Sequence, residues 1–135
     1  MPLNLGLLCS NEGLELAAVI KSVTAGRLPA SISIVIADRH SSALTLARSA
    51  GFYGVFIPRA PFHANRDGYE RRLVEILTLA EVGLVVLVGY ERQPGPVLTS
   101  SFRLIGQGLG PEELVVRLTE EVKGLLYTLA PGEKP

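Results

Sequence analysis

The sequence predicts one α/β domain of three layers, in which helices cover both faces of a mostly parallel sheet. Three observations lead to this prediction. Segments with the composition of strands alternate with amphipathic helical segments along the chain, which is the order that builds βαβ units. Residues 84–88 are apolar at every position, as strands are when both faces of their sheet are covered. The chain has 135 residues, enough for one domain with a substantial core and too few for two.

The N-terminal half contains three predicted strands and two predicted helices. The first strand, 3–9, is rich in leucine, and a polar turn leads from it into a helix over 14–24, which ends at a glycine with a proline soon after. The second strand, 31–37, is rich in isoleucine and valine, which favour strands. A short helix over 43–50, closed by a glycine, precedes a short third strand at 54–57.

The C-terminal half starts with a longer helix that begins near Asn65 and has one apolar face. The strand 84–88 follows, and then a segment with two prolines over 93–101, which is expected to be irregular with one helical turn. Residues 103–105 are a candidate fifth strand. Right-handed crossovers and a switch point after the first strand predict a Rossmann-like sheet of four or five strands, in the order 3-2-1-4, with the fifth beside the fourth.

The whole chain, 1–135, is expected to be a single domain with a main frame over 1–105. Residues 106–110 (Gly-Gln-Gly-Leu-Gly) are expected to form a flexible junction. Pro111 then opens a C-terminal helix over 111–130, with two glutamates in its first turn, where the helix dipole favours acidic side chains.

The charge balance argues against two classes of partner. The chain has 13 basic and 13 acidic residues, so no basic surface for nucleic acid or anionic lipid is predicted. No apolar run reaches the roughly 18 residues that a membrane span requires. The single cysteine, Cys9, excludes an intrachain disulfide, is expected to fill the core, and is consistent with the cytoplasm. No metal site is predicted.

Two motifs resemble the phosphoribosylglycinamide formyltransferase family, which uses 10-formyltetrahydrofolate in purine biosynthesis. Residues 65–71 (Asn-Arg-Asp-Gly-Tyr-Glu-Arg) match the family's Ser-Arg-Glu-x-Tyr-Asp-Arg/Lys, and 89–92 (Gly-Tyr-Glu-Arg) match its Gly-Phe-Met-Arg. The resemblance implies that Arg66 faces the ligand cleft. It also implies that Gly89, Tyr90 and Arg92 lie where family members hold the folate pteridine.

The first turn departs from the family's phosphate-binding pattern. Family members have Ser-Gly-x-Gly-Ser-Asn-Leu here, and this chain has Ser-Asn-Glu-Gly-Leu-Glu-Leu over 10–16. Gly13 is kept as a candidate ligand contact, but Glu12 and Glu15 now flank it. Each carboxylate would oppose a bound phosphate by about 1 kcal/mol or more, so phosphate binding at this turn is disfavoured.

The residues that the family uses for catalysis have no counterparts here. The family supplies Asn and His in an Asn-x-His-Pro-Ser loop after its fifth strand, and an Asp further on, whereas 106–108 are Gly-Gln-Gly. Formyl transfer needs an oxyanion-stabilising group and a proton shuttle. The sequence therefore predicts a formyltransferase-like protein without formyl-transfer activity and with no bound cofactor, or with 10-formyltetrahydrofolate if the family activity is retained.

Three readings of the function remain open. The leading one is a protein that binds a small nucleotide or a folate-like ligand, or that associates with itself. The second is an active formyltransferase with relocated groups, namely His63 as a weak catalytic candidate beside Arg66 and Arg92. The third is a pure oligomerisation module, a homodimer that covers the edge of the sheet or the last helix. Asp38 is expected to be a solvated loop residue, because the Gly-x-Gly-x-x-Gly pattern of dinucleotide sites is absent.

Overall fold

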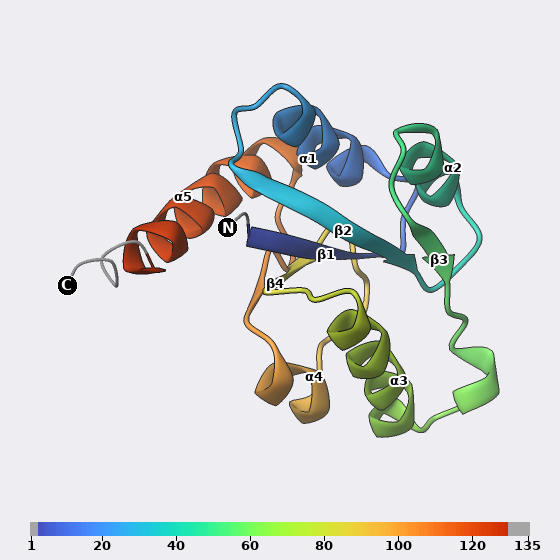
Figure 1. Cartoon of the computed structure of the whole chain (residues 1–135). Helices are drawn as coiled ribbons and strands as arrows, with labels where there is room; N and C mark the ends of the chain where they lie inside the picture. The colour runs from blue at the N-terminus through green and yellow to red at the C-terminus, as the bar shows by residue number, and fades with distance from the viewer. Residues whose placement is uncertain (1–2, 130–135) are drawn as a thin grey trace.

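The computed structural model describes residues 3–129, with side chains to 126, and forms a single sheet flanked by helices (Figure 1). The strands are β1 (Leu3–Cys9), β2 (Ala30–Ala37), β3 (Gly54–Phe56), β4 (Leu84–Leu87) and β5 (Leu104–Ile105). The helices are α1 (Leu14–Thr24), α2 (Ser42–Ser49), α3 (Arg66–Leu79), α4 (Pro96–Ser101) and α5 (Pro111–Leu129), with a 3-10 helix at Ala60–Phe62.

The sheet has the topology that the sequence predicts. Its five strands are all parallel and follow the order β3-β2-β1-β4-β5, so the fifth strand forms and lies beside the fourth. β2 and β3 lie on one side of β1 in the sheet, and the chain then crosses to the other side of β1 to form β4. This reversal places the carboxyl ends of β1 and β4 at the switch point, where ligands bind in open α/β sheets.

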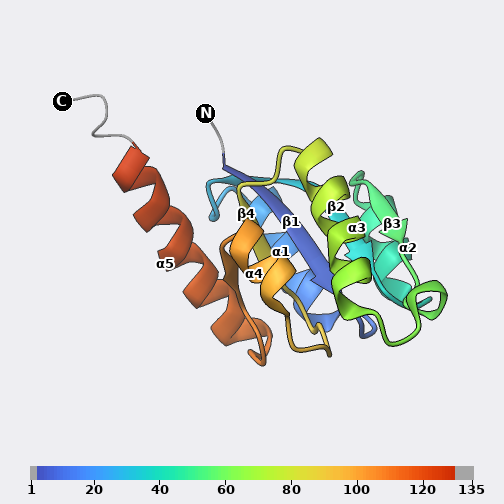
Figure 2. The same cartoon turned by 90° about the horizontal axis from the view of Figure 1, so that it is seen from below.

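Helices cover both faces of the sheet, as the apolar strands require. α1, α2 and α5 pack on one face, and α3 and α4 pack on the other (Figures 1 and 2). Alternate residues of β4 divide between the two cores: Leu84 and Val86 face α1 and α5, whereas Val85 and Leu87 face α3 and α4. Each of these four side chains is almost completely buried, which explains why this strand has no polar position.

The C-terminal helix lies beside the β5 side of the sheet. Figure 2 shows α5 along that side, with its C-terminal end extending past the strands. Leu114, Leu118 and Val122 recur at helical spacing and are fully buried against the core. An ion pair between Arg103 and Glu121 joins this helix to the residue that precedes β5. Residue 130, the last residue of the predicted helix, lies outside the described residues, as do residues 1–2 of the predicted main frame.

Local capping explains why α3 begins where the sequence predicts. The Asn65 side chain accepts a hydrogen bond of 2.9 Å from the backbone N–H of Gly68, which caps the first turn of the helix. The predicted flexible junction is a turn between β5 and α5, in which Gly106 and Gly108 have positive φ. Across the described residues, no helix is both long enough and apolar enough to cross a membrane.

Candidate functional site

The arginine pocket is a cavity of about 210 Å³ beside the N-terminus of α3. Its walls come from the loop that leads from β3 to α3, from the first turns of α3, and from the loop after β4. The lining residues are Arg59, Phe62, His63, Ala64, Asn65, Arg66, Tyr69, Arg92 and Gln93. The structure therefore brings together three of the residues that the sequence singled out, namely His63, Arg66 and Arg92.

Two of the arginines in this pocket are exposed and carry no ion pair with any residue of 3–126. Arg66 is in the first turn of α3, and Arg92 is on the loop after β4. The Arg66 side chain passes over the backbone of Gly95, where an added Cβ would lie 2.5 Å from its Nε atom. These two guanidinium groups thus give the pocket an uncompensated positive charge beside the positive end of a helix.

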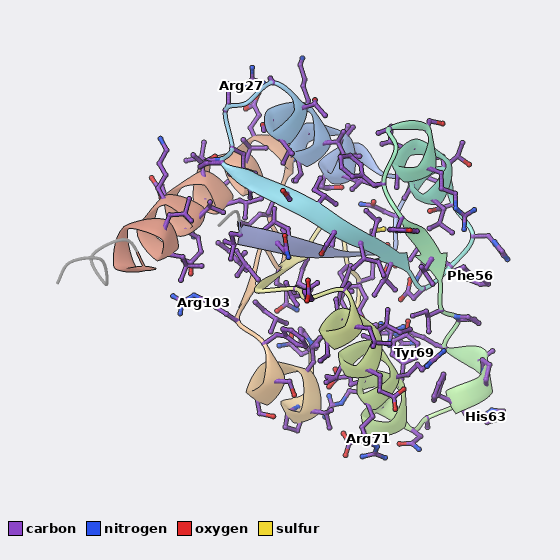
Figure 3. The ribbon with its side chains drawn as sticks, in the orientation of Figure 1. Arg27, Phe56, His63, Tyr69, Arg71 and Arg103 are labelled. Atoms are coloured by element: carbon purple, nitrogen blue, oxygen red, sulfur yellow. The ribbon has the colours of Figure 1, made fainter. Side chains whose placement is uncertain are left out.

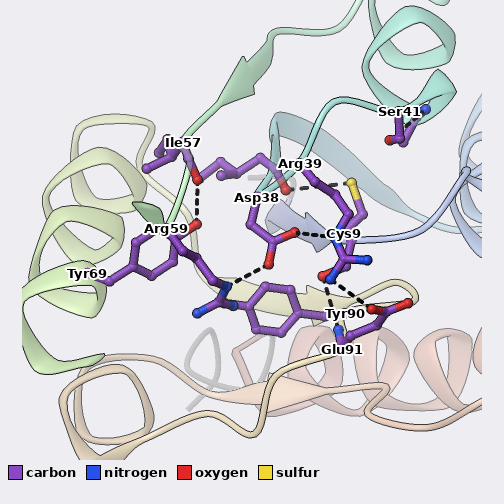
Figure 4. Close-up of polar contacts among 12 residues, drawn as sticks. Cys9, Asp38, Arg39, Ser41, Ile57, Arg59, Tyr69, Tyr90 and Glu91 are labelled. Carbon is purple, nitrogen blue, oxygen red and sulfur yellow. Dashed lines mark hydrogen bonds and ion pairs between the residues drawn. The ribbon is translucent and has the colours of Figure 1, made fainter. Parts of the chain in front are cut away.

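The third arginine, Arg59, is held in a polar network at the carboxyl ends of β2 and β4 (Figure 4). Its Nε atom lies 2.7 Å from Oδ2 of Asp38, and its Nη2 atom donates to the hydroxyl of Tyr90. The prediction that Asp38 is a solvated loop residue is therefore wrong, because its side chain is only 2% exposed. Burial of a carboxylate requires a partner, and Arg59, which the sequence analysis did not single out, supplies it.

Two tyrosine rings hold the guanidinium of Arg59 in place. Its central carbon lies 4.6 Å from the ring centre of Tyr69 and 5.2 Å from that of Tyr90. Tyr69 packs inward, donates its hydroxyl to the carbonyl of Ile57 at 2.7 Å, and meets Phe62 edge to face. Burial raises the pKa of Tyr69 above its usual value and that of Tyr90 to about 12, so both rings stay neutral and the cation–π contacts persist at physiological pH.

The Asp38 carboxylate also contacts a second arginine, Arg39, beside the switch point of the sheet. Its Oδ1 atom is buried without a hydrogen bond and lies 3.8 Å from Nε of Arg39. Arg39 in turn pairs with Glu91 at 2.9 Å, which connects the loops after β2 and β4 across the end of β1 (Figure 4). Side chains of the protein itself therefore occupy part of the place where this class of sheet binds ligands.

Two buried side chains fix the loop that carries Arg92 and Gln93. At its start, the hydroxyl of Ser10 accepts the backbone N–H of Glu91 at 3.1 Å. At its end, the carboxylate of Glu70, which is 3% exposed, accepts the backbone N–H groups of Gly95 and Leu98. Glu70 thus caps α4 from a neighbouring helix, because Gly95 has no side chain to do so.

The two histidines occupy different places. His63 is exposed on the loop before α3, at the periphery of the molecule (Figure 3). Its backbone has φ 51° and ψ −120°, a combination that side-chain-bearing residues rarely adopt and that stores strain. His40 stacks on Phe56 with ring centres 3.9 Å apart and does not line the arginine pocket.

Gly13 and Gly89 do not line the arginine pocket, and their surroundings explain both glycines. Gly13 has φ 105° and precedes α1, where an added Cβ would lie 3.2 Å from the backbone of Ala43. Gly89 has φ 69° and is covered by the side chain of Asn11, which an added Cβ would meet at 2.0 Å. Tyr90 is also absent from the pocket lining, because its ring is buried beneath Arg59.

The acidic residues of the first turn bind neighbouring groups of the protein. Glu12 accepts hydrogen bonds from the backbone N–H and the hydroxyl of Ser42, and these bonds lower the pKa of Glu12. Glu15 accepts a bond of 2.7 Å from the amide of Asn11. Both carboxylates therefore link the turn to its surroundings at the place where a phosphate would otherwise approach α1.

A second pocket, of about 250 Å³, lies at the carboxyl ends of β4 and β5. The amides of Gln93 and Gln107 face each other there, and Nε2 of Gln107 donates to Oε1 of Gln93 at 2.9 Å. Gly106 and Gln107 occupy the positions after β5 at which the sequence analysis placed the family's catalytic loop. Its lining residues are Leu87, Gln93, Pro94, Thr99, Leu104, Ile105, Gly106 and Gln107.

Cys9 fills the core at the end of β1, as predicted. Its side chain is fully buried, and burial together with the charge of Asp38 raises the pKa of its thiol to about 12. The thiol is therefore protonated and unreactive at physiological pH. Among the described residues, no group of three His, Cys, Asp or Glu side chains could hold a metal ion.

Comparison with known proteins finds its matches among solved structures. No family model and no curated protein matches the sequence. Glycinamide ribonucleotide transformylase 1 from Symbiobacterium toebii matches 89% of this chain with a TM-score of 0.73 and 26% identity. The phosphoribosylglycinamide formyltransferase from Coxiella burnetii matches 90% of it with a TM-score of 0.70 and 20% identity. A formyltetrahydrofolate deformylase from Pseudomonas putida matches 74% with a TM-score of 0.66 and 18% identity.

These structures are longer than the chain that matches them. The chain spans 60% of the Symbiobacterium toebii structure, 82% of the Coxiella burnetii structure and 35% of the Pseudomonas putida structure. The chain thus has the fold of the phosphoribosylglycinamide formyltransferases, which confirms the resemblance seen in its sequence.

Proposed function

We propose that this protein is a formyltransferase-like protein that binds a small anionic ligand in the arginine pocket and does not transfer formyl groups. The observation that supports the binding role is the pair of arginines, Arg66 and Arg92, which have no acidic partner among residues 3–126. Unpaired guanidinium groups in a concave site attract carboxylates and phosphates, which they bind through paired N–H donors.

The absence of formyl transfer is proposed from the residues that follow β5. Acyl transfer to an amine needs a donor for the developing oxyanion and a group that moves a proton, both close to the reacting carbon. Gly106 offers no side chain at this place, and the Gln107 amide offers no proton shuttle near neutral pH. His63 lies in the arginine pocket, which is a different cavity from the one beside Gln107.

The resemblance narrows the ligands to be tested. It suggests a folate-like molecule, with 10-formyltetrahydrofolate as the ligand if the family activity is retained, or a nucleotide of purine biosynthesis. A cytoplasmic location is proposed along with it.

The proposed binding can be tested by calorimetry with purified protein. We expect folates or glycinamide ribonucleotide to bind with a dissociation constant that rises at least tenfold in Arg66→Ala and Arg92→Ala. Arg71→Ala is the matched control, because Arg71 is an exposed arginine of the same helix that does not line the pocket (Figure 3). Formyl transfer from 10-formyltetrahydrofolate to glycinamide ribonucleotide by the wild-type protein would disprove the inactive part of the proposal.

An active formyltransferase with relocated groups is the second candidate. The observation that favours it is the shared pocket of His63, Arg66 and Arg92. If His63 moves the proton, turnover follows a pH profile that His63→Ala abolishes. Turnover that is unchanged in His63→Ala would exclude this role for the histidine.

Self-association is the third candidate, and a groove between α1 and α5 is where we expect it. The groove has a volume of about 360 Å³, and Val116 on its rim is 56% exposed. The sheet edge is a poorer candidate, since β5 has only two residues. A homodimer that uses this groove should weaken in Val116→Glu but not in Leu79→Glu, whose wild-type side chain is 84% exposed on α3. A monomer in light scattering at high concentration would remove this candidate.

A further inference from the structure

We infer that the arginine pocket takes a compact dianion, the phosphate group of a small phosphorylated metabolite, and that Arg59 sets this preference. The inference rests on the proposed function of the pocket as an anion site. It goes beyond that function by naming the ligand class and by assigning a role to an arginine that neither sequence motif contains.

The size of the pocket limits the ligand. At about 210 Å³ it is smaller than the roughly 300–1,000 Å³ of most small-molecule sites. A phosphate group with a few carbon atoms fits such a volume, whereas a folate carries a fused ring, a benzoyl ring and a glutamate. The partly exposed ring of Phe62 provides an apolar wall for the carbon atoms.

The charges in the pocket set the charge of the ligand. Arg59, Arg66 and Arg92 contribute three positive charges to the pocket wall. The carboxylates of Asp38, which pairs with Arg59, and of Glu70, which binds the N–H of Gly95 beneath Arg66, offset part of this charge and leave it net positive. Asp67 is exposed, does not line this pocket, and forms no ion pair with Arg66 within the described part of the chain. The N-terminus of α3, a helix of 14 residues, adds a partial positive charge. A dianion neutralises this charge, and a monoanion leaves part of it uncompensated.

Arg59 differs from the other two arginines because it is fixed before any ligand arrives. Its side chain is 18% exposed, is paired with Asp38, and lies between the rings of Tyr69 and Tyr90. A guanidinium has five N–H donors, and the bonds to Asp38 and to the Tyr90 hydroxyl use two of them. The remaining donors are held in place by these contacts. Together with the donors of Arg66 and Arg92 they outnumber the two oxygens of a carboxylate and suit the three free oxygens of a phosphate monoester.

Calorimetry at constant ionic strength tests the inference with four probes: inorganic phosphate, glycerol 3-phosphate, glutarate and folate. We expect glycerol 3-phosphate to bind at least tenfold more tightly than glutarate, and folate to bind more weakly still. Affinity for glycerol 3-phosphate should rise between pH 5 and pH 7.5 as the phosphate loses its second proton, near pH 6. Repeating the pH series in His63→Ala removes any contribution of that imidazole.

Variants of Arg59 distinguish the effect of its guanidinium geometry from the effect of its positive charge. Arg59→Lys keeps the positive charge but loses the planar fork, and should lower the affinity for glycerol 3-phosphate about tenfold. Arg71→Ala should bind as the wild type does. Because Arg59 is partly buried, the melting temperature of each variant is first compared with that of the wild type. Arg66→Lys makes the same change at an exposed position, where the substitution does not threaten folding.

The possible results distinguish the inference from the proposed function. Folate binding that depends on Arg66 and Arg92, with no binding of glycerol 3-phosphate, would overturn the inference and leave the proposed function intact. Failure of all four probes to bind would overturn the inference, and failure of glycinamide ribonucleotide as well would overturn the proposed function. Phosphate binding that is equally weak in the wild type, Arg66→Lys and Arg59→Lys would show unspecific attraction, and would also overturn the inference.

Discussion

Glu70 accepts a hydrogen bond of 2.7 Å from the backbone N–H of Gly95, and so connects α3 to the loop that carries Arg92 and Gln93. The second carboxylate oxygen accepts the N–H of Leu98 at 3.0 Å, so one buried side chain satisfies two donors at the start of α4. Ser10 holds the other end of the same loop through Glu91. The position of Arg92 therefore depends on residues that do not line the pocket.

Replacing Glu70 should affect both stability and binding. Glu70→Ala leaves two buried N–H groups without an acceptor, at about 1–3 kcal/mol each, so we expect the free energy of unfolding in urea to fall by about 2–6 kcal/mol. Glu70→Gln keeps one acceptor oxygen and should recover about half of this loss. If the loop positions Arg92, ligand affinity should fall in Glu70→Ala and recover in part in Glu70→Gln. Equal stability of the alanine variant and the wild type would contradict this role.

Removing only one member of the Asp38–Arg59 pair should destabilise the protein more than removing both. Asp38→Ala leaves the Arg59 guanidinium largely buried and unpaired, and we expect it to lower the free energy of unfolding by about 3 kcal/mol. The double variant Asp38→Leu/Arg59→Met removes both charges and should be closer to the wild type than the single variant is. Chemical denaturation of the three proteins measures both differences, and a double variant that is less stable than Asp38→Ala would contradict the pairing.

The thiol of Cys9 should be inert in the folded protein and should make stability depend on alkaline pH. Its pKa rises from 9.0 to about 12 on folding, so the folded state favours the protonated thiol. This contribution is fully present below pH 9 and is lost as the pH rises from 9 to 12, by an amount on the order of a few kcal/mol. Between pH 9 and pH 12, the free energy of unfolding should decline less steeply in Cys9→Ala than in the wild type. Rapid labelling of the native protein by a thiol reagent at pH 8 would contradict the burial of Cys9.

Relief of backbone strain at His63 should stabilise the protein. A residue with a side chain at φ 51° and ψ −120° costs on the order of 1–3 kcal/mol, and glycine adopts this conformation without that cost. After the entropy that glycine loses on folding, His63→Gly should raise the free energy of unfolding by roughly 1 kcal/mol. His40→Gly is the control, since His40 has no positive φ and its ring contact with Phe56 would be lost. A loss of stability in both variants would mean that His63 is not strained.

The fold could be predicted closely because its signals are local. The all-apolar strand 84–88 and the alternation of strands with amphipathic helices indicated a covered parallel sheet, and the order of strands followed from the handedness of crossovers. Part of the candidate site followed too, since His63, Arg66 and Arg92 lie near one another once the strand ends are aligned. Arg59 gave no comparable signal, because a single arginine after a proline has no spacing that reveals its partners.

The sequence by itself determined the sheet, the helices on its two faces and the core position of Cys9. It also indicated that the turn after the first strand disfavours phosphate binding. It could do so because hydrophobic periodicity and helix capping act between residues a few positions apart. Only the tertiary structure decided that Asp38 is buried, that Arg59 fills the space between two tyrosines, and that Gly13 and Gly89 serve packing. These contacts join residues as far as 78 positions apart (Asn11 and Gly89), and burial and charge pairing at that separation depend on how the strand ends meet in space.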